Sequence, residues 1–400
     1  MSDLALFLLI FSAVGTGWWL GRRTTAQTAG VGDSIDLPSK YYKGLNYLLD
    51  DQPDGAIDAF IEALEVNSDT FETHIALGNL LRRKGEVDRA IRIHQNLLAR
   101  PGVPARQLHQ AHLELARDYI SAGLLDRAEQ LLQDLVRESS EQRAASLKYL
   151  LEIYQHQRDW EQAIEVAKEL VPRKTLLAKE QPEKCSVLVP LSHFCCELAE
   201  LNVQTNDMPG ARSQLKRALT YDKNCVRASL LLGQLELQTG HPELAVKALK
   251  RVRFQDAEFI PETVEPIHSC YSQLDDQTGL YQYLRDCMDI YPSATLMLRI
   301  AEDLRSHQGD EAAGSFISQE LKSHPSLSGL AALIQLHVAN ASGAARDNLT
   351  LLQQLVDKLI ANRPTYRCNH CGFAGKKLHW FCPGCKEWGS IKAIRGTEGD

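Results

Sequence analysis

Apolar residues recur at helical spacing along most of the chain, from Lys40 to about Asn362. Short turns interrupt this pattern roughly every dozen residues, for example at Gly85-Glu86, Ala122-Gly123 and Gly240-His241. The alternation of apolar and polar residues that indicates half-buried strands does not persist in this stretch. The pattern therefore predicts an all-α body made of short helices joined by tight turns.

One small residue recurs inside this helical stretch at a nearly constant interval. The steps between its successive positions are 34, 38, 35, 48, 34, 35 and 33 residues. A mostly small residue precedes each position by twelve residues, and a mostly larger residue follows it by four. A fixed period of this length indicates internal repeats. The recurrent positions are Ala56, Ala90, Ala128, Ala163, Ala211, Ala245, Leu280 and Ala313.

A basal period of 34 residues with this small, small, large pattern resembles the tetratricopeptide repeat. In that repeat two antiparallel helices cross closely where small side chains meet, because a large side chain there would force them apart. One unit cannot bury its own apolar face, so neighbouring units stack into a superhelix. We expect an array over residues 39–362 with eight units, a degenerate ninth over residues 330–360, and an insertion around residues 174–184.

A stacked array of this kind presents a concave groove lined by the first helix of each unit. Such grooves bind peptides or protein segments. Six polar or charged side chains occur where the repeat spacing directs them toward the groove, although each of them taken alone also fits a solvated polar face. The six candidates are Asn79, Arg82, Arg117, Lys148, Gln155 and Gln234.

The amino-terminal segment predicts a membrane anchor. Residues 4–20 contain no charge, and with their flanks they reach the roughly 17–25 residues that span a bilayer as a helix. Two arginines follow the apolar run directly, which places the remainder of the chain in the cytoplasm. A cleaved signal peptide would instead carry its positive charge before the apolar run. We therefore expect an anchor over residues 1–23 and a flexible linker over residues 24–38.

Four cysteines near the carboxyl end form two CxxC pairs separated by ten residues. This spacing closes a tetrahedral thiolate site for one Zn or Fe ion, and the ligand type alone does not decide between the two metals. Four thiolates leave no open coordination position for a substrate. A redox CxxC pair is the alternative, but the strand–helix–strand pattern that would support it is missing. The predicted metal ligands are Cys368, Cys371, Cys382 and Cys385.

The segment over residues 363–400 resembles a rubredoxin-like zinc ribbon. Gly372 follows the first CxxC pair, whereas Lys386 stands where the second pair would usually be followed by glycine. Metal binding is expected to supply much of the folding free energy of so small a domain. His370 and His379 are alternative ligands, although surface positions suit them better. Only a short connection precedes the ribbon, so we expect it to pack on the array.

Basic and aromatic residues interleave in the ribbon, as they do on surfaces that stack nucleic-acid bases. In a domain of this size the aromatic side chains more often form the core, so we expect no nucleic acid as a partner. The whole chain agrees, because 44 Lys and Arg oppose 51 Asp and Glu, and polyanion binders usually carry a basic excess. The remaining cysteines are expected to be buried thiols in a reducing compartment. They are Cys185, Cys195, Cys196, Cys225, Cys270 and Cys287.

The order of three parts is more specific than any one of them. A single span ending in WWLGRR, a tetratricopeptide array and a CNHCG…CPGC ribbon resemble the lipopolysaccharide assembly protein B family of Gram-negative bacteria over essentially the full length. The resemblance implies an inner-membrane protein that faces the cytoplasm and regulates lipopolysaccharide synthesis. It implies as partners the membrane-anchored AAA+ protease FtsH and the deacetylase LpxC, whose degradation the family promotes.

Two further function classes stay open. A scaffold that gathers lipopolysaccharide synthesis and transport proteins would use the same groove, and a homo-oligomer is compatible with either role. An enzyme is the least supported class, because the sequence contains no G-x-S-x-G, P-loop or H-E-x-x-H motif.

Overall fold

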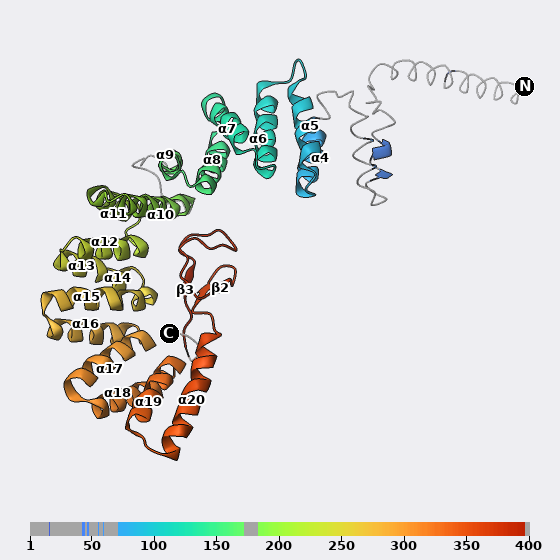
Figure 1. Cartoon of the computed structure of the whole chain (residues 1–400). Helices are drawn as coiled ribbons and strands as arrows, with labels where there is room; N and C mark the ends of the chain where they lie inside the picture. Colours follow the sequence, from blue (N-terminus) through green and yellow to red (C-terminus); the bar gives the residue numbers. More distant parts are fainter. Residues whose placement is uncertain are drawn as a thin grey trace, which may run out of the picture. The chain divides into compact units, whose positions relative to one another are not determined.

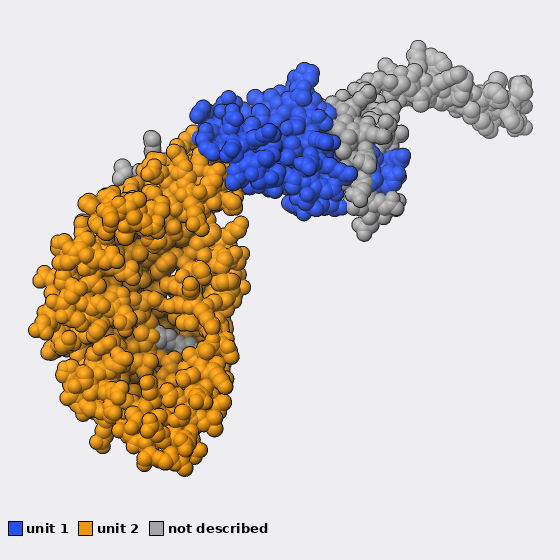
Figure 2. Space-filling view, viewed as in Figure 1, with its two compact units in different colours: residues 1–142 blue, residues 143–400 orange. Residues whose placement is uncertain are grey.

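The computed structural model describes residues 71–171 and 183–396, together with a few single residues before position 71. The chain forms two compact units, residues 1–142 and residues 143–400, which are described separately (Figure 2). The expected anchor and linker, and most of the insertion around residues 174–184, lie outside the described residues. Within the described part of the chain, no helix is both long enough and apolar enough to cross a membrane.

The described part of the first unit contains two helical hairpins (Figure 1). In each hairpin two consecutive helices pack against each other, as the repeat pattern predicts. The helices are α4 (Phe71–Arg83), α5 (Val87–Leu98), α6 (Ala105–Ser121) and α7 (Leu125–Glu138).

The second unit, over its described residues, contains six hairpins of the same kind in a curved stack (Figure 1). The first four are α8 (Arg143–Gln157) with α9 (Trp160–Leu170), α10 (Glu183–Gln204) with α11 (Met208–Tyr221), α12 (Val226–Gln238) with α13 (Pro242–Leu249), and α15 (Val264–Leu274) with α16 (Gln277–Ile290). The last two are α17 (Ala294–Gln308) with α18 (Asp310–Ser323), and α19 (Leu327–Asn340) with α20 (Ala344–Ala361). The final hairpin lies over the residues where the degenerate ninth unit is expected.

The small and large positions of the repeat meet as the spacing predicts. A methyl group built on Gly78 of α4 would lie 2.4 Å from Nε2 of His94 on α5, and one built on Gly233 of α12 would lie 2.5 Å from Cγ of Leu249 on α13. Both distances are far below van der Waals contact. Glycine at these positions therefore lets the two helices of a hairpin approach each other.

The turn inside the hairpins has one recurrent backbone conformation, because the residue after the first helix takes a positive φ. This left-handed residue ends the helix and lets the chain reverse. Among the eight described hairpins, glycine supplies it in three and a residue with a side chain supplies it in three others. The glycines are Gly85, Gly123 and Gly240, with φ of 86°, 75° and 76°, and the other residues are Arg158, Asn206 and Asp275, with φ of 59°, 62° and 54°. In the last two turns Gly309 and Gly343 also have a positive φ, of 89° and 59°, but their ψ values are 178° and −145°.

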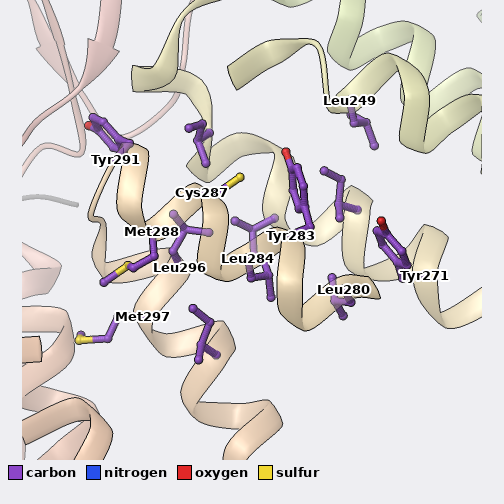
Figure 3. Close-up of a cluster of buried hydrophobic side chains, with 14 of the residues drawn as sticks. Leu249, Tyr271, Leu280, Tyr283, Leu284, Cys287, Met288, Tyr291, Leu296 and Met297 are labelled. Carbon is purple, nitrogen blue, oxygen red and sulfur yellow. The ribbon is translucent and has the colours of Figure 1, made fainter. Parts of the chain in front are cut away.

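A buried hydrophobic core of the second unit contains side chains from α12 through α19 (Figure 3). Leu280 and Leu284 on α16 are fully buried in it, although the other repeats carry alanine at the position of Leu280. The scattered cysteines behave as predicted wherever the structure describes their side chains, since all five are buried. They are Cys195, Cys196, Cys225, Cys270 and Cys287.

One segment between α13 and α15 departs from the regular repeat. It consists of the short helix α14 (Val252–Gln255) and two 3₁₀ turns, η3 (Ala257–Phe259) and η4 (Pro261–Thr263). Pro261 begins the second turn, where the missing N–H of proline costs no hydrogen bond. Periodicity alone does not distinguish this segment from an ordinary first helix of a repeat.

The ribbon follows α20 and contains a three-stranded antiparallel sheet. Its strands are β1 (Tyr366–Cys368), β2 (Ala374–Gly375) and β3 (Ile391–Ala393), in the spatial order β2-β1-β3. Tyr366 pairs with Gly375 on one side and with Ala393 on the other. The fold is therefore an all-α repeat array with a small β-ribbon at its carboxyl end.

Candidate functional site

The four predicted cysteines converge on one point. All four Sγ atoms lie within 4.8 Å of one another. The Sγ atoms of Cys368 and Cys385 are 3.7 Å apart, and those of Cys371 and Cys382 are 3.6 Å apart. A tetrahedral ion with metal–sulfur bonds of about 2.3 Å would place its ligands about 3.8 Å apart. The sulfur positions therefore fit a tetrahedral zinc or iron ion.

The two CxxC turns share one backbone conformation. Gly372 has a φ of 78° and its N–H donates to the carbonyl of Cys368 over 3.0 Å. Lys386 has a φ of 60° and its N–H donates to the carbonyl of Cys382 over 2.9 Å. The second turn thus departs from the ribbon pattern in residue type but not in geometry.

The surroundings of Cys368 favour a thiolate. Burial raises the pKa of this thiol, but Ser390 and the backbone N–H groups of Cys371 and His370 outweigh that effect and lower it to about 6. The N–H groups of His370 and Cys371 lie 3.4 Å and 3.5 Å from the sulfur, and Ser390 Oγ lies 3.3 Å from it. A thiolate is the form that binds a metal.

The alternative histidine ligands do not join the site. His370 and His379 are both exposed. In the part of the chain that the structure describes, the group that could hold a metal contains only the four cysteines. The ring of His379 instead contacts Phe373, with the ring centroids 6.2 Å apart.

The ribbon is fastened to the array through Trp388. Its indole stacks on His193 of α10 at a centroid distance of 4.8 Å and meets the edge of Phe194 at 5.9 Å. Trp160, the first residue of α9, contacts the same indole at 6.5 Å. The indole Nε1–H also donates to Oε1 of Gln155 on α8, over 3.5 Å. Three helices of the array therefore form an aromatic pocket for one tryptophan of the ribbon.

A second contact joins the ribbon to the irregular segment between α13 and α15. Trp380 stacks on Phe259 at 5.4 Å, and Lys392 Nζ lies 2.7 Å from a carboxylate oxygen of Asp256. Glu258 pairs with both Lys392 and Arg395 at 2.5 Å. Burial alone would lower the pKa of Lys392. The carboxylates of Asp256 and Glu258 have the larger, opposite effect, so the pKa of Lys392 lies above its ordinary value.

These contacts confirm that the ribbon packs on the array and correct one expectation. The aromatic side chains of the ribbon were expected to form its own core, whereas Trp380 and Trp388 contact side chains of the array. The ribbon's buried cluster consists of Cys368, Cys382 and Ile391, with Tyr366 and Phe373 among the partly buried residues packed against it. Strands of two or three residues are too short to enclose an indole.

The groove candidates of the first unit are held in a network of charges. The Arg82 side chain is 9% exposed and pairs with Glu114 at 2.8 Å and with Asp118 at 2.7 Å. Asn79 accepts a hydrogen bond from Arg82, and Arg117 pairs with Glu114 at 2.7 Å. These three candidates are thus brought together around buried carboxylates rather than left free on a surface.

Sequence reasoning did not find the acidic partners in this network or their histidine neighbour. Asp118 is fully buried and also contacts His94 Nδ1 at 2.5 Å. One feature of the sequence indicates such a partner. His94 occupies the large position of its repeat, and a polar ring buried there requires a hydrogen-bond partner.

The groove candidates of the second unit are not brought together. Gln155 is covered by Trp388, whereas Lys148 is exposed. Gln234 is exposed and lines a cavity of about 220 Å³ together with Glu200 and Val203. Peptide binding by any of the six candidates stays a prediction.

Known protein families match both parts of this architecture. A family described as rubredoxin metal binding domain matches residues 366–393. Three families described as tetratricopeptide repeat match residues 73–102, 113–175 and 203–262. The matches agree with the cysteine site and with the helical hairpins.

Two curated relatives align with nearly the whole chain. Lipopolysaccharide assembly protein B of Escherichia coli strain K12 is 37% identical over 395 residues, which cover 98% of this chain and 99% of the relative. The protein of the same name from Haemophilus influenzae is 34% identical over 406 residues, which cover 98% of each chain. This chain belongs to the lipopolysaccharide assembly protein B family. The repeat array and the Cys₄ ribbon are thus the two described parts of this member of the lipopolysaccharide assembly protein B family. The four cysteines form the metal-binding site of its ribbon.

Solved structures with tetratricopeptide folds resemble parts of this lipopolysaccharide assembly protein B family member. The crystal structure of MamA protein is 17% identical and covers 48% of this chain and 96% of its own, with a TM-score of 0.33. A tetratricopeptide repeat protein from Parabacteroides merdae is 14% identical and covers 72% of this chain and 100% of its own, with a TM-score of 0.32.

Proposed function

We propose that this protein regulates lipopolysaccharide assembly at the inner membrane as a non-enzymatic adaptor. In this proposal it promotes proteolysis of the deacetylase LpxC by the membrane-anchored protease FtsH. Two relatives named for lipopolysaccharide assembly, each aligned with nearly the full chain, support the role in that process.

The observation that carries the adaptor role is the attachment of a saturated metal site to a repeat array. The four cysteines would occupy all positions of a tetrahedral ion, so a bound ion would stabilise the ribbon and would offer no place for substrate. The ribbon in turn packs on α8, α9 and α10 and on the segment before α15. The ribbon and these helices are thus in direct contact, and repeat arrays of this kind bind other proteins.

The adaptor works by raising a local concentration. An anchor over residues 1–23 confines the array near the membrane protease, and the array with its ribbon holds the client. Binding of the second protein then becomes effectively intramolecular, and no new chemistry is required of the adaptor.

The experiment is depletion of this protein in its host, followed by measurement of the lifetime of LpxC after translation is blocked. A longer lifetime supports the adaptor. An unchanged lifetime together with defective lipopolysaccharide contradicts it and favours a scaffold for synthesis and transport proteins. Complementation with Cys382→Ser is expected to fail, whereas Lys377→Ala, a change of an exposed ribbon residue, is the matched control and is expected to restore normal turnover.

A second experiment separates the anchor from the array. The apolar span is replaced by an unrelated membrane helix of the same length. If FtsH is still recovered with the protein, the span is only a tether, whereas loss of FtsH makes the span itself a contact surface.

A further inference from the structure

The last helix of the array has an apolar stripe that no part of the described chain covers. Leu351, Leu352, Leu355 and Leu359 of α20 are 57%, 49%, 49% and 50% exposed. Val356 of the same helix is only 8% exposed. At 100° per residue the four leucines span about 100° of the helix, and Val356 lies about 40° beyond Leu352, at the border with the buried side of the helix. Helix α19 is the helix against which α20 mainly packs.

This stripe is unusual for the end of a repeat array. Terminal repeats normally carry a polar outer face, because no further repeat covers them. Helix α16, inside the array, buries Leu280, Leu284 and Cys287 between its neighbours. The end helix α20 instead exposes four leucines, and contiguous apolar surface of this kind marks an interaction site.

The spacing of the stripe identifies the shape of its partner. Leu352, Leu355 and Leu359 follow one another at steps of three and four residues, and Asn348 precedes Leu352 by four. Alternating steps of three and four form the seam of a helix that packs along another helix. The surface therefore fits an amphipathic helix with the same spacing.

We propose that a second copy of this chain covers the stripe, with its α20 helix antiparallel to the first. The charges beside the stripe are complementary in that arrangement. Asp347 and Lys358 lie on the same edge of the helix, next to Leu351, and neither forms an ion pair within the described residues. When Leu352 of one copy packs on the partner's Leu355, Asp347 comes beside the partner's Lys358. The two-fold symmetry of such a dimer produces this pair twice.

The parallel arrangement does not form these pairs. In it, the edge that carries Asp347 and Lys358 faces the opposite edge of the partner helix, so neither charge meets its counterpart. Within one helix the two residues are eleven positions apart, or about 16 Å along the axis, so they do not pair with each other. The charge pattern thus selects the antiparallel dimer.

The test is a charge swap in the full chain in detergent micelles, with the association constant measured by sedimentation equilibrium. Lys358→Asp alone and Asp347→Lys alone are each expected to weaken association by about tenfold, because each converts two attractive pairs into two repulsive ones. The double variant Asp347→Lys/Lys358→Asp is expected to restore the wild-type constant. Restoration requires that Asp347 of one copy meets Lys358 of another.

Two further variants complete the design. Leu355→Glu places a charge in the seam and is expected to weaken association by at least about a hundredfold. Asp357→Lys changes a charge on the opposite side of α20 and is the matched control, for which no change is expected. Circular dichroism checks that each variant remains folded. A chain that stays monomeric, a dimer indifferent to Leu355→Glu, or a charge swap without restoration would each overturn the proposal.

Discussion

Single residues in left-handed backbone conformations determine how tightly the turns of this protein close. Lys386 occupies such a position in the second CxxC turn, where Gly372 occupies it in the first. A side chain with a β-carbon pays a steric cost there that glycine avoids. The protein therefore tolerates a departure from the ribbon pattern at the expense of some local stability.

Replacement of Lys386 with glycine is expected to stabilise the ribbon by about 1 kcal/mol. The measurement is the rate at which metal-loaded protein releases its ion to a chelator, and a slower release is expected. Lys377→Gly is the control, since Lys377 is exposed and is not among the residues with positive φ. Faster release from the Lys386 variant would contradict the assigned backbone role.

Close helix crossings depend on glycine in the same residue-specific way. Gly78→Ala is expected to destabilise the first unit by about 1–3 kcal/mol, because the new methyl group would meet the buried ring of His94. Gly314→Ala is the matched control on α18, where a methyl group would have no neighbour within 4 Å. It is expected to be neutral or to stabilise by up to about 1 kcal/mol through higher helix propensity. Urea unfolding of both variants measures the difference, and equal effects would refute the crossing model.

At the scale of elements, the ribbon lies on the concave side of the helices of the second unit. Figure 1 shows the ribbon on the inner side of the curve that α10 to α17 describe. The regular hairpins supply the aromatic pocket for Trp388, whereas the irregular segment before α15 supplies Phe259, Asp256 and Glu258. The departure from the repeat is thus the element that fits the ribbon to the array.

The aromatic pocket is expected to weaken in acid. Burial, and then the nearby Arg227 cation, lower the pKa of His193 to about 3. Between pH 6.5 and 3 the unfolded chain binds a proton at this position and the folded chain does not, so stability falls as the pH falls. The loss is at most about 1.4 kcal/mol per pH unit.

The measurement is the free energy of unfolding of the second unit in urea across this pH range. His193→Gln is expected to show a weaker pH dependence than the wild type. The exposed His370→Gln variant is the control and should retain the wild-type slope. Identical slopes for all three proteins would show that His193 is not buried as a neutral ring.

At the scale of the whole molecule, the cysteine site links metal binding to the surface of the array. Because the ribbon depends on its metal for folding free energy, and because Trp388 and Lys392 attach it to the array, loss of the metal is expected to uncover the helices beneath. The array contains its own buried core, so it is expected to remain helical when the ribbon unfolds.

Cys382→Ser is accordingly expected to unfold the ribbon, leave the helical circular-dichroism signal nearly unchanged and abolish function. Hydrogen exchange is expected to increase in α10 and in residues 251–263, while the protein stays in the membrane fraction. Cys270→Ser is the control, because Cys270 is buried far from the ribbon in sequence and belongs to the array core. Full activity of the Cys382 variant would contradict the metal-site assignment.

The sequence by itself determined the repeat, the ribbon that follows it and the four cysteines of the metal-binding site. These features are local, since a period of 34 residues reports how two helices cross, and two CxxC pairs bring their own sulfurs together. It could not determine which surfaces the parts share. Gln155 and Arg82 were assigned to an open groove. Only the tertiary structure shows that Gln155 contacts Trp388 of the ribbon and that Arg82 pairs with buried carboxylates. Contacts such as Trp388 with Gln155 join residues 233 positions apart, and helical periodicity carries no information about partners at that distance.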